Sequence, residues 1–208
     1  MQSQTIFGIF RVGALVAGAA LAIVPAMGQE ENYKSEVSAQ AFGTFPTKTI
    51  SNGVSQDATN SGGVLGSYRY LFDKNNAMEF NYGYTLNTQT YGFPAGPVAI
   101  KNHLNEATAA YVGRYPHHWV SPFGLLGAGA LVFDAASFVN NPQGAGFQAR
   151  AAFLYGAGSD FRLSEHFFLR AEYRGLVYSS PNFGIPQLAG HAQLAHRAEP
   201  SIGFGARF

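Results

Sequence analysis

The residues best suited to chemistry in this sequence are its histidines, and their spacing does not assemble a catalytic set. A serine nucleophile needs a general base within hydrogen-bond reach, and a His-x-Ser pattern on one strand face would supply both groups. No serine stands two positions after any of four histidines: His103, His166, His191 and His196. Because His191 and His196 fall in a predicted long loop that fixes no geometry, solvated loop residues are the favoured interpretation.

The adjacent pair His117-His118 is a poor candidate for a metal site. Neighbouring residues of a strand point to opposite faces, so the two rings would not converge on one ion. We interpret both as turn residues. The sequence has no cysteine, which excludes disulfides, thiolate metal sites and a lipid-anchored cysteine. We therefore expect no catalytic residue, no cofactor and no metal.

Arginines form the second chemically informative group. Six of them lie within runs of alternating character, opposite the large apolar side chains: Arg69, Arg114, Arg150, Arg170, Arg174 and Arg207. Arginine on a lipid-facing surface at mid-depth costs ~2–4 kcal/mol, so this pattern favours a membrane barrel with arginines in its lumen. Four acids on the same faces are the expected ion-pair partners: Glu79, Glu106, Glu172 and Glu199. A soluble barrel of the lipocalin type, apolar inside and polar outside, is the alternative.

Eight runs with a period of two position these residues. They cover residues 36–41, 64–73, 78–85, 106–115, 123–134, 147–156, 169–177 and 199–208. Most runs are about ten residues long, as a tilted strand needs to cross a bilayer. In the Gly/Ala-rich fifth run we expect four residues to face outward because Asp134 falls on the other face: Phe123, Leu125, Leu131 and Phe133.

The connections alternate between short and long. Short turns are expected at residues 73–76, 116–119 and 161–165. Long loops are expected at Pro46–Gly63, Leu86–Asn105, Ala135–Gly146 and Ser179–Arg197. Outer-membrane barrels place short turns in the periplasm and long loops outside. The sequence predicts an all-β protein: an eight-stranded antiparallel up-and-down transmembrane β-barrel over residues 36–208.

The first residues resemble an export signal. Arg11 precedes an apolar run, Val12–Val24, which Pro25 ends, and Ala26-Met27-Gly28 offers small residues before a cut at Gln29. The run has about thirteen residues, against roughly twenty for a spanning helix, so a cleaved signal peptide over 1–28 is favoured over an uncleaved anchor. Residues 29–35 would form a periplasmic tail, and the protein is expected in the bacterial cell outer membrane.

Tyrosines on the apolar faces suit the interfacial belts of a membrane protein, where an aromatic ring carries a polar tip. They are Tyr68, Tyr70, Tyr82, Tyr84, Tyr111, Tyr115 and Tyr173. Plain strand propensity is the competing explanation. Lys and Arg number 13 against 12 acids, so a nucleic-acid partner is not expected.

The last run, Glu199-Pro-Ser-Ile-Gly-Phe-Gly-Ala-Arg-Phe208, resembles the C-terminal signature of bacterial outer-membrane proteins. Together with Leu169-Arg-Ala-Glu-Tyr-Arg174, it makes the chain similar to the OmpA-like β-barrel family. The resemblance implies that Ile202, Phe204 and Phe208 form the signal read by the barrel-assembly machinery. We expect the barrel domain alone, without the peptidoglycan-binding domain of full-length OmpA-type proteins, so cell-wall tethering is not implied.

Three functions stay open. The first is a structural or surface-interaction barrel whose partners are outer-membrane lipid, lipopolysaccharide and an unknown loop ligand. The second is a narrow OmpW-like conduit for small solutes. The third is a lipid-modifying barrel enzyme, which the histidine spacing does not favour.

Overall fold

The structure is a computed structural model that describes residues 33–51, 54–93, 96–135, 146–183 and 193–208. In these ranges the regular secondary structure is entirely β. The strands are β1 (Ser35–Pro46), β2 (Thr49–Ser51), β3 (Val54–Ala58), β4 (Ser61–Leu71), β5 (Asn76–Phe93), β6 (Gly96–Arg114), β7 (Val120–Asp134), β8 (Phe147–Arg162), β9 (Phe167–Ser179) and β10 (Leu194–Arg207). No helix in the described ranges is long and apolar enough to cross a membrane.

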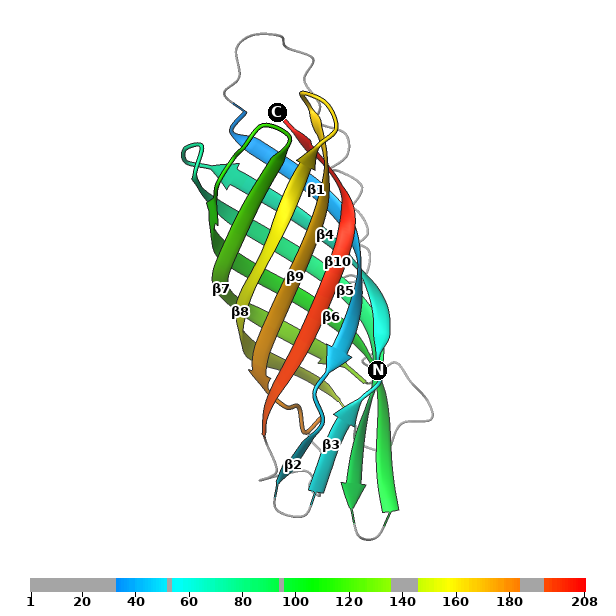
Figure 1. Ribbon diagram of the computed structural model, residues 1–208. Coiled ribbons are helices and arrows are strands. Elements are labelled where there is room, and N and C mark those ends of the chain that lie inside the picture. Colours follow the sequence, from blue (N-terminus) through cyan, green and yellow to red (C-terminus); the bar gives the residue numbers. More distant parts are fainter. Residues whose placement is uncertain (1–32, 52–53, 94–95, 136–145, 184–192) are drawn as a thin grey trace, which may run out of the picture.

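Eight of the strands close into one antiparallel barrel (Figure 1). Each strand pairs with its neighbour in the order β1-β4-β5-β6-β7-β8-β9-β10, and β10 returns to β1. The predicted eight-stranded up-and-down fold is confirmed. The short turns also lie where the sequence placed them, between β4 and β5, β6 and β7, and β8 and β9.

The seam between β1 and β10 closes the barrel. Its register runs from Glu36↔Arg207 to Pro46↔Arg197. At its end, the backbone N–H of Ser35 donates to the Phe208 carbonyl at 3.0 Å, and the N–H of Phe208 donates back to the Ser35 carbonyl at 2.9 Å.

Two of the predicted long loops are largely strand. The region 86–105 continues the β5–β6 hairpin, paired up to Phe93↔Gly96, and the region 46–63 contains β2, β3 and the start of β4. β3 pairs with the C-terminal part of β5, for example Ser55↔Gly92. The prediction of irregular loops was wrong because buried polar residues, among them Asn87 and Gln89, share the inner face with Tyr91 and Ile100. They interrupt the hydrophobic alternation without removing strand pairing. The two hairpins extend from the end of the barrel opposite the C-terminus (Figure 1, bottom).

The other two predicted loops are only partly described. Most of Ala135–Gly146 and the centre of Ser179–Arg197 lie outside the described residues. Of the second loop, Leu194–Arg197 already belongs to β10.

The predicted facing of β7 was wrong. Phe123, Leu125, Leu131 and Phe133 are buried in the lumen, while Leu126 faces outward and is 57% exposed. The Phe123 ring explains the choice of face, since it lies beneath the Arg69 guanidinium, with 4.3 Å from Cζ to the ring centroid. Asp134 faces outward at the very end of the strand, where an acid is far less costly than at mid-depth.

Candidate functional site

The lumen holds the main concentration of charge, arranged in two tiers. The tier nearer the short turns, here called the inner cluster, consists of three acids and three buried arginines: Glu36, Glu79, Asp160, Arg69, Arg114 and Arg170. Arg170 is its centre. Its Nε donates to Asp160 Oδ1 at 2.6 Å and its Nη1 to Glu79 Oε2 at 3.0 Å.

Arg69 and Arg114 complete the inner cluster. Arg69 Nη2 lies 2.6 Å from Glu79 Oε2, and its Nη1 lies 3.1 Å from Asp160 Oδ2. Arg114 Nη1 donates to Glu36 Oε1 at 3.0 Å. Since every member is buried, the loss of one partner would leave a charge without compensation inside the barrel.

The tier farther from the short turns, here called the outer cluster, consists of Glu106, Arg174, Arg197 and Glu199. Arg174 lies 2.8 Å from Glu106 and 2.5 Å from Glu199. Arg197 lies 2.9 Å and 2.5 Å from the same two acids. Two acids thus share two arginines in a closed square, and all four side chains are buried.

Three members of these clusters were not predicted as site residues: Glu36, Asp160 and Arg197. The period-two alternation of the strands could have identified two of them. Asp160 falls on the same strand face as Gln148 and Gly156, and Arg197 falls on the same face as Glu199. The predicted run 147–156 ended too early, and the predicted run 199–208 began too late. Glu36 belongs to the predicted run 36–41, which alternates too weakly to suggest a role for it.

Three further residues of the predicted ionic network also lie on the lumen side, but they do not take part in the close ion pairs of either cluster. Arg207 is 3.9 Å from Glu36 and partly exposed at the inner rim. Arg150 lies towards the other end of β8, and its Nε has no hydrogen-bond partner among the described residues. Glu172 lies between the two clusters and belongs to neither.

Apolar side chains fill the lumen beyond the outer cluster. Phe133 packs against Tyr178 and Phe183, with ring centroids 5.9 and 6.1 Å apart. Gln148 Oε1 accepts from the backbone N–H of Phe183 at 3.0 Å. The segment that follows β9 is thereby held over the mouth of the barrel, where Phe183 is only 1% exposed.

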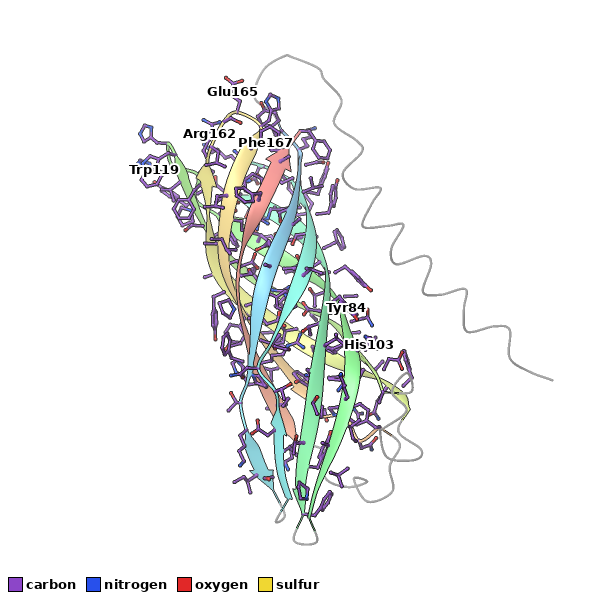
Figure 2. All side chains as sticks on the ribbon, turned by 90° about the vertical axis from the view of Figure 1, so that its right-hand side faces the viewer. Tyr84, His103, Trp119, Arg162, Glu165 and Phe167 are labelled. Carbon is purple, nitrogen blue, oxygen red and sulfur yellow. The ribbon has the colours of Figure 1, made fainter. Side chains whose placement is uncertain are left out.

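On the outward face, two histidines bond to tyrosines. Tyr84 Oη lies 2.6 Å from His103 Nδ1, and Tyr155 Oη lies 2.9 Å from His196 Nε2. Figure 2 shows Tyr84 and His103 close together, about half-way along the molecule and well away from Trp119. Both histidines were predicted in loops, but they are on β6 and β10. His117 and His118 lie in a turn, as predicted, and His191 lies outside the described residues.

The seven predicted interface tyrosines all lie on the outward face. Tyr68, Tyr70, Tyr111 and Tyr115 are near the short turns, and Tyr82 and Tyr84 lie midway along β5. Tyr173 lies midway along β9 rather than at an end. Around the short turns the belt continues with exposed Trp119, Phe167 and Leu163.

The C-terminal signature also faces outward. Ile202 and Phe204 are 57% and 67% exposed, and Phe208 bonds through its backbone to Ser35.

The sequence matches a family model described as the outer membrane protein beta-barrel domain over residues 14–208. The chain belongs to this family. Members of this family are bacterial outer-membrane proteins, and the chain is an integral barrel of the Gram-negative outer membrane. No curated protein matches the sequence at a significant level.

Solved structures of the family share the fold. The attachment invasion locus protein Ail of Yersinia pestis is 21% identical, with 85% of this chain and 99% of that chain covered and a TM-score of 0.50. OprG from Pseudomonas aeruginosa is 14% identical, with 85% and 96% covered and a TM-score of 0.60. Neisserial surface protein A is 15% identical, with 84% and 97% covered and a TM-score of 0.56. At these identities the likeness establishes architecture.

Proposed function

We propose that this protein is a surface-interaction barrel, in which the membrane part anchors and stiffens the envelope and the projecting sheet meets ligands outside the cell. The length of β5 and β6 carries the proposal. The two strands stay paired to Phe93↔Gly96, whereas β7 ends at Asp134, the partner of His103. Residues 96–102 therefore extend beyond β7. We place this end outside the cell because short turns of outer-membrane barrels lie in the periplasm.

The outward polar pairs support contact with lipopolysaccharide. Tyr84–His103 and Tyr155–His196 lie close to the ends of the neighbouring strands β7 and β9, and Tyr82 Oη donates to Asn105 Oδ1 at 2.8 Å nearby. Hydroxyl, amide and imidazole groups at this level suit the sugar and phosphate groups of outer-leaflet lipid.

A narrow OmpW-like conduit is the second candidate. The two ion-paired clusters and the apolar side chains beyond them occupy the lumen, and this supports a scaffold over a conduit. Planar-bilayer recordings of the refolded protein separate the two. We expect no steady conductance, and a steady channel would favour the conduit.

A lipid-modifying enzyme is the third candidate. His103 and His196 are each held by a tyrosine, and neither has a serine two positions away, which supports a non-enzymatic role. Mass spectrometry of lipopolysaccharide incubated with the folded barrel tests this. Modification that disappears in His196→Ala or His191→Ala would revive the enzyme.

The proposed function is tested by shortening the projecting hairpin. Residues 88–101 are replaced by Asn-Gly, a two-residue turn that lets Asn87 and Asn102 remain paired. A strain lacking the protein then receives the wild type or the short variant. We expect both to fold and to restore detergent resistance. Only wild-type cells should adhere to immobilised heparin and a glycan panel, chosen because a solved structure of Ail contains the heparin analogue sucrose octasulfate. Equal adhesion of both strains would contradict a role for the sheet.

We further propose that residues 1–28 are a cleaved signal peptide, followed by a short periplasmic tail over 29–35, and that Ile202, Phe204 and Phe208 recruit the barrel-assembly machinery. N-terminal sequencing of the mature protein should begin at Gln29. Replacing Phe204 and Phe208 with serine should leave precursor in the periplasm while refolding in detergent still succeeds.

A further inference from the structure

One buried acid stands apart from the two lumen clusters. Six acids are buried in the described lumen: Glu36, Glu79, Glu106, Asp160, Glu172 and Glu199. Five of them take part in the ion pairs described above. Glu172 does not, and among the described residues neither of its carboxylate oxygens has a hydrogen-bond partner, although the residue is only 5% exposed.

Both clusters are complete without Glu172. The outer cluster has two acids and two arginines, and the inner cluster has three acids and three buried arginines. Glu172 lies on β9 between Arg170 of one cluster and Arg174 of the other, on the same strand face. Each of these arginines already has at least two acids of its own within ion-pair distance.

The groups around Glu172 come from several strands. The charged groups that act on it are Arg69 of β4, Glu79 of β5, and Arg170 and Arg174 of β9. On β8 the residue paired with Glu172 is Gly158, which offers no side chain. On β10, Ser201 Oγ donates to Gln40 Oε1 at 2.9 Å and to the backbone carbonyl of Glu172 at 3.4 Å, so this hydroxyl is directed away from the carboxylate.

Asn81, which lies two residues beyond Glu79 on the lumen face of β5, is a further polar group in the middle of the lumen. It is 5% exposed, and its side chain interacts with that of Glu79. The middle of the lumen thus holds a carboxylate without a hydrogen-bond partner, whereas each acid of the clusters on both sides has an arginine within ion-pair distance. An ionised carboxylate buried without donors is very costly, and a negative Glu79 makes a further negative charge worse.

We propose that Glu172 is a proton-binding site in the middle of the lumen and is carried as the neutral carboxylic acid. A proton from water forms the O–H bond on one carboxylate oxygen, and no redox change is involved. The two clusters then keep their internal balance, and the site responds to pH independently of the outer loops. The inference concerns the lumen alone and goes beyond the surface-interaction function.

Infrared spectroscopy of the folded barrel in nanodiscs tests the protonation state directly. At mildly acidic pH, we expect the carbonyl stretch of a protonated carboxyl group in the wild type, with a downshift in D2O. The band should remain in Glu165→Gln, which changes an exposed turn acid, and disappear in Glu172→Gln. Raising the pH should replace it with a carboxylate band. Absence of the band in the wild type, or its survival in Glu172→Gln, would overturn the proposal.

Unfolding midpoints give an independent readout. Glutamine is close in shape to the protonated acid, so Glu172→Gln should shift the unfolding midpoint no more than Glu165→Gln. Glu199→Gln should lower the midpoint strongly, because it removes a negative charge that Arg174 and Arg197 share. A loss in Glu172→Gln as large as in Glu199→Gln, or a failure to fold, would show an ionised and paired Glu172. Sodium or potassium could also stabilise the wild type but not Glu172→Gln at constant ionic strength. That result would show that Glu172 binds a metal cation and not a proton, and it would likewise overturn the proposal.

Discussion

Tyr155 of β8 reaches across β9 to bond with His196 of β10, with 2.9 Å between Oη and Nε2. The strand that it crosses carries Gly175 at this point, and a Cβ there would lie 2.4 Å from Tyr155 Cζ. The missing side chain of Gly175 therefore makes the contact possible. Three strands on the outward face are tied together by one ring lying flat over the sheet.

The first prediction concerns this crossing. Gly175→Ala should displace the Tyr155 ring and break its bond to His196, lowering the free energy of unfolding by about 1 kcal/mol. The His196 ring resonances report the bond, and urea unfolding reports the stability. Gly124→Ala is the matched control, because Gly124 also faces outward and a Cβ there meets nothing closer than 3.9 Å. Unchanged His196 resonances in Gly175→Ala would contradict the role of the glycine.

The second prediction tests the facing of β7. Leu126 faces lipid, and its neighbour Leu125 is buried in the lumen. Because the sequence has no cysteine, single cysteines at the two positions can be labelled without background. A lipid-soluble thiol reagent in liposomes should label Leu126→Cys readily and Leu125→Cys poorly. The reverse pattern would restore the sequence-based register.

The third prediction concerns Asp160. Its two oxygens bind Arg170 at 2.6 Å and Arg69 at 3.1 Å. Asp160→Asn should lower the free energy of unfolding by roughly 3 kcal/mol, because breaking a buried pair leaves a charge uncompensated. The gel mobility shift between folded and heated protein, followed across urea, measures the loss.

A double variant separates lost charge balance from lost packing. Adding Arg170→Met to Asp160→Asn removes the surplus positive charge and should recover part of the stability. Asp57→Asn, which changes an exposed residue of β3, serves as the control. If the double variant lost as much free energy of unfolding as the two single variants together, this would argue against charge balance as the cause.

The fourth prediction concerns the β4–β5 turn, outside the membrane. The Asn76 side chain donates to both Asp73 oxygens, at 3.0 and 2.9 Å, and the backbone N–H of Asn75 donates at 2.7 Å. These hydrogen bonds hold the pKa of Asp73 below its usual 3.8, and the bond from the Asn76 side chain has the largest effect. The ionised form therefore stabilises the turn above the unfolded-state pKa, and this stabilisation is lost as pH falls through the lowered folded-state pKa.

Carboxyl NMR titration checks the turn directly. The Asp73 resonance should titrate below the usual value in the wild type. In Asn76→Ala the pKa should rise towards that value, because the largest cause of the shift has been removed. A titration midpoint that does not move would assign the shift to the backbone donors alone.

Much of the barrel was predictable because its strands are amphipathic in a fixed way. Arg69, Arg170 and Arg174 each stand opposite aromatic or aliphatic neighbours, and lipid excludes guanidinium groups strongly enough to decide the face. The short turns followed from their Asp, Asn, Pro and Ser residues. Periodicity therefore sufficed wherever one face meets lipid.

Periodicity failed where both faces are alike. In the region 86–105, buried polar residues such as Asn87 and Asn102 alternate with apolar ones on the inner face, so its strands carry only an interrupted apolar stripe. β7 is rich in glycine and alanine on both faces, and contacts distant in sequence decide its orientation, such as the stacking of Phe123 on Arg69 and the packing of Phe133 against Phe183. The partners within the clusters depend on side chains meeting across the lumen, which strand-by-strand reading does not reveal.

The seam that joins Ser35 to Phe208 has a consequence for biogenesis. The first and last strands of the barrel are neighbours, so the ribosome must finish β10 before β1 can find its permanent partner. Until then the growing chain carries two unsatisfied edges, the kind of surface on which strands of different molecules pair and aggregate. Closure is thus a post-synthetic event, and the edges of β1 and β10 cannot satisfy each other until the whole chain has been made.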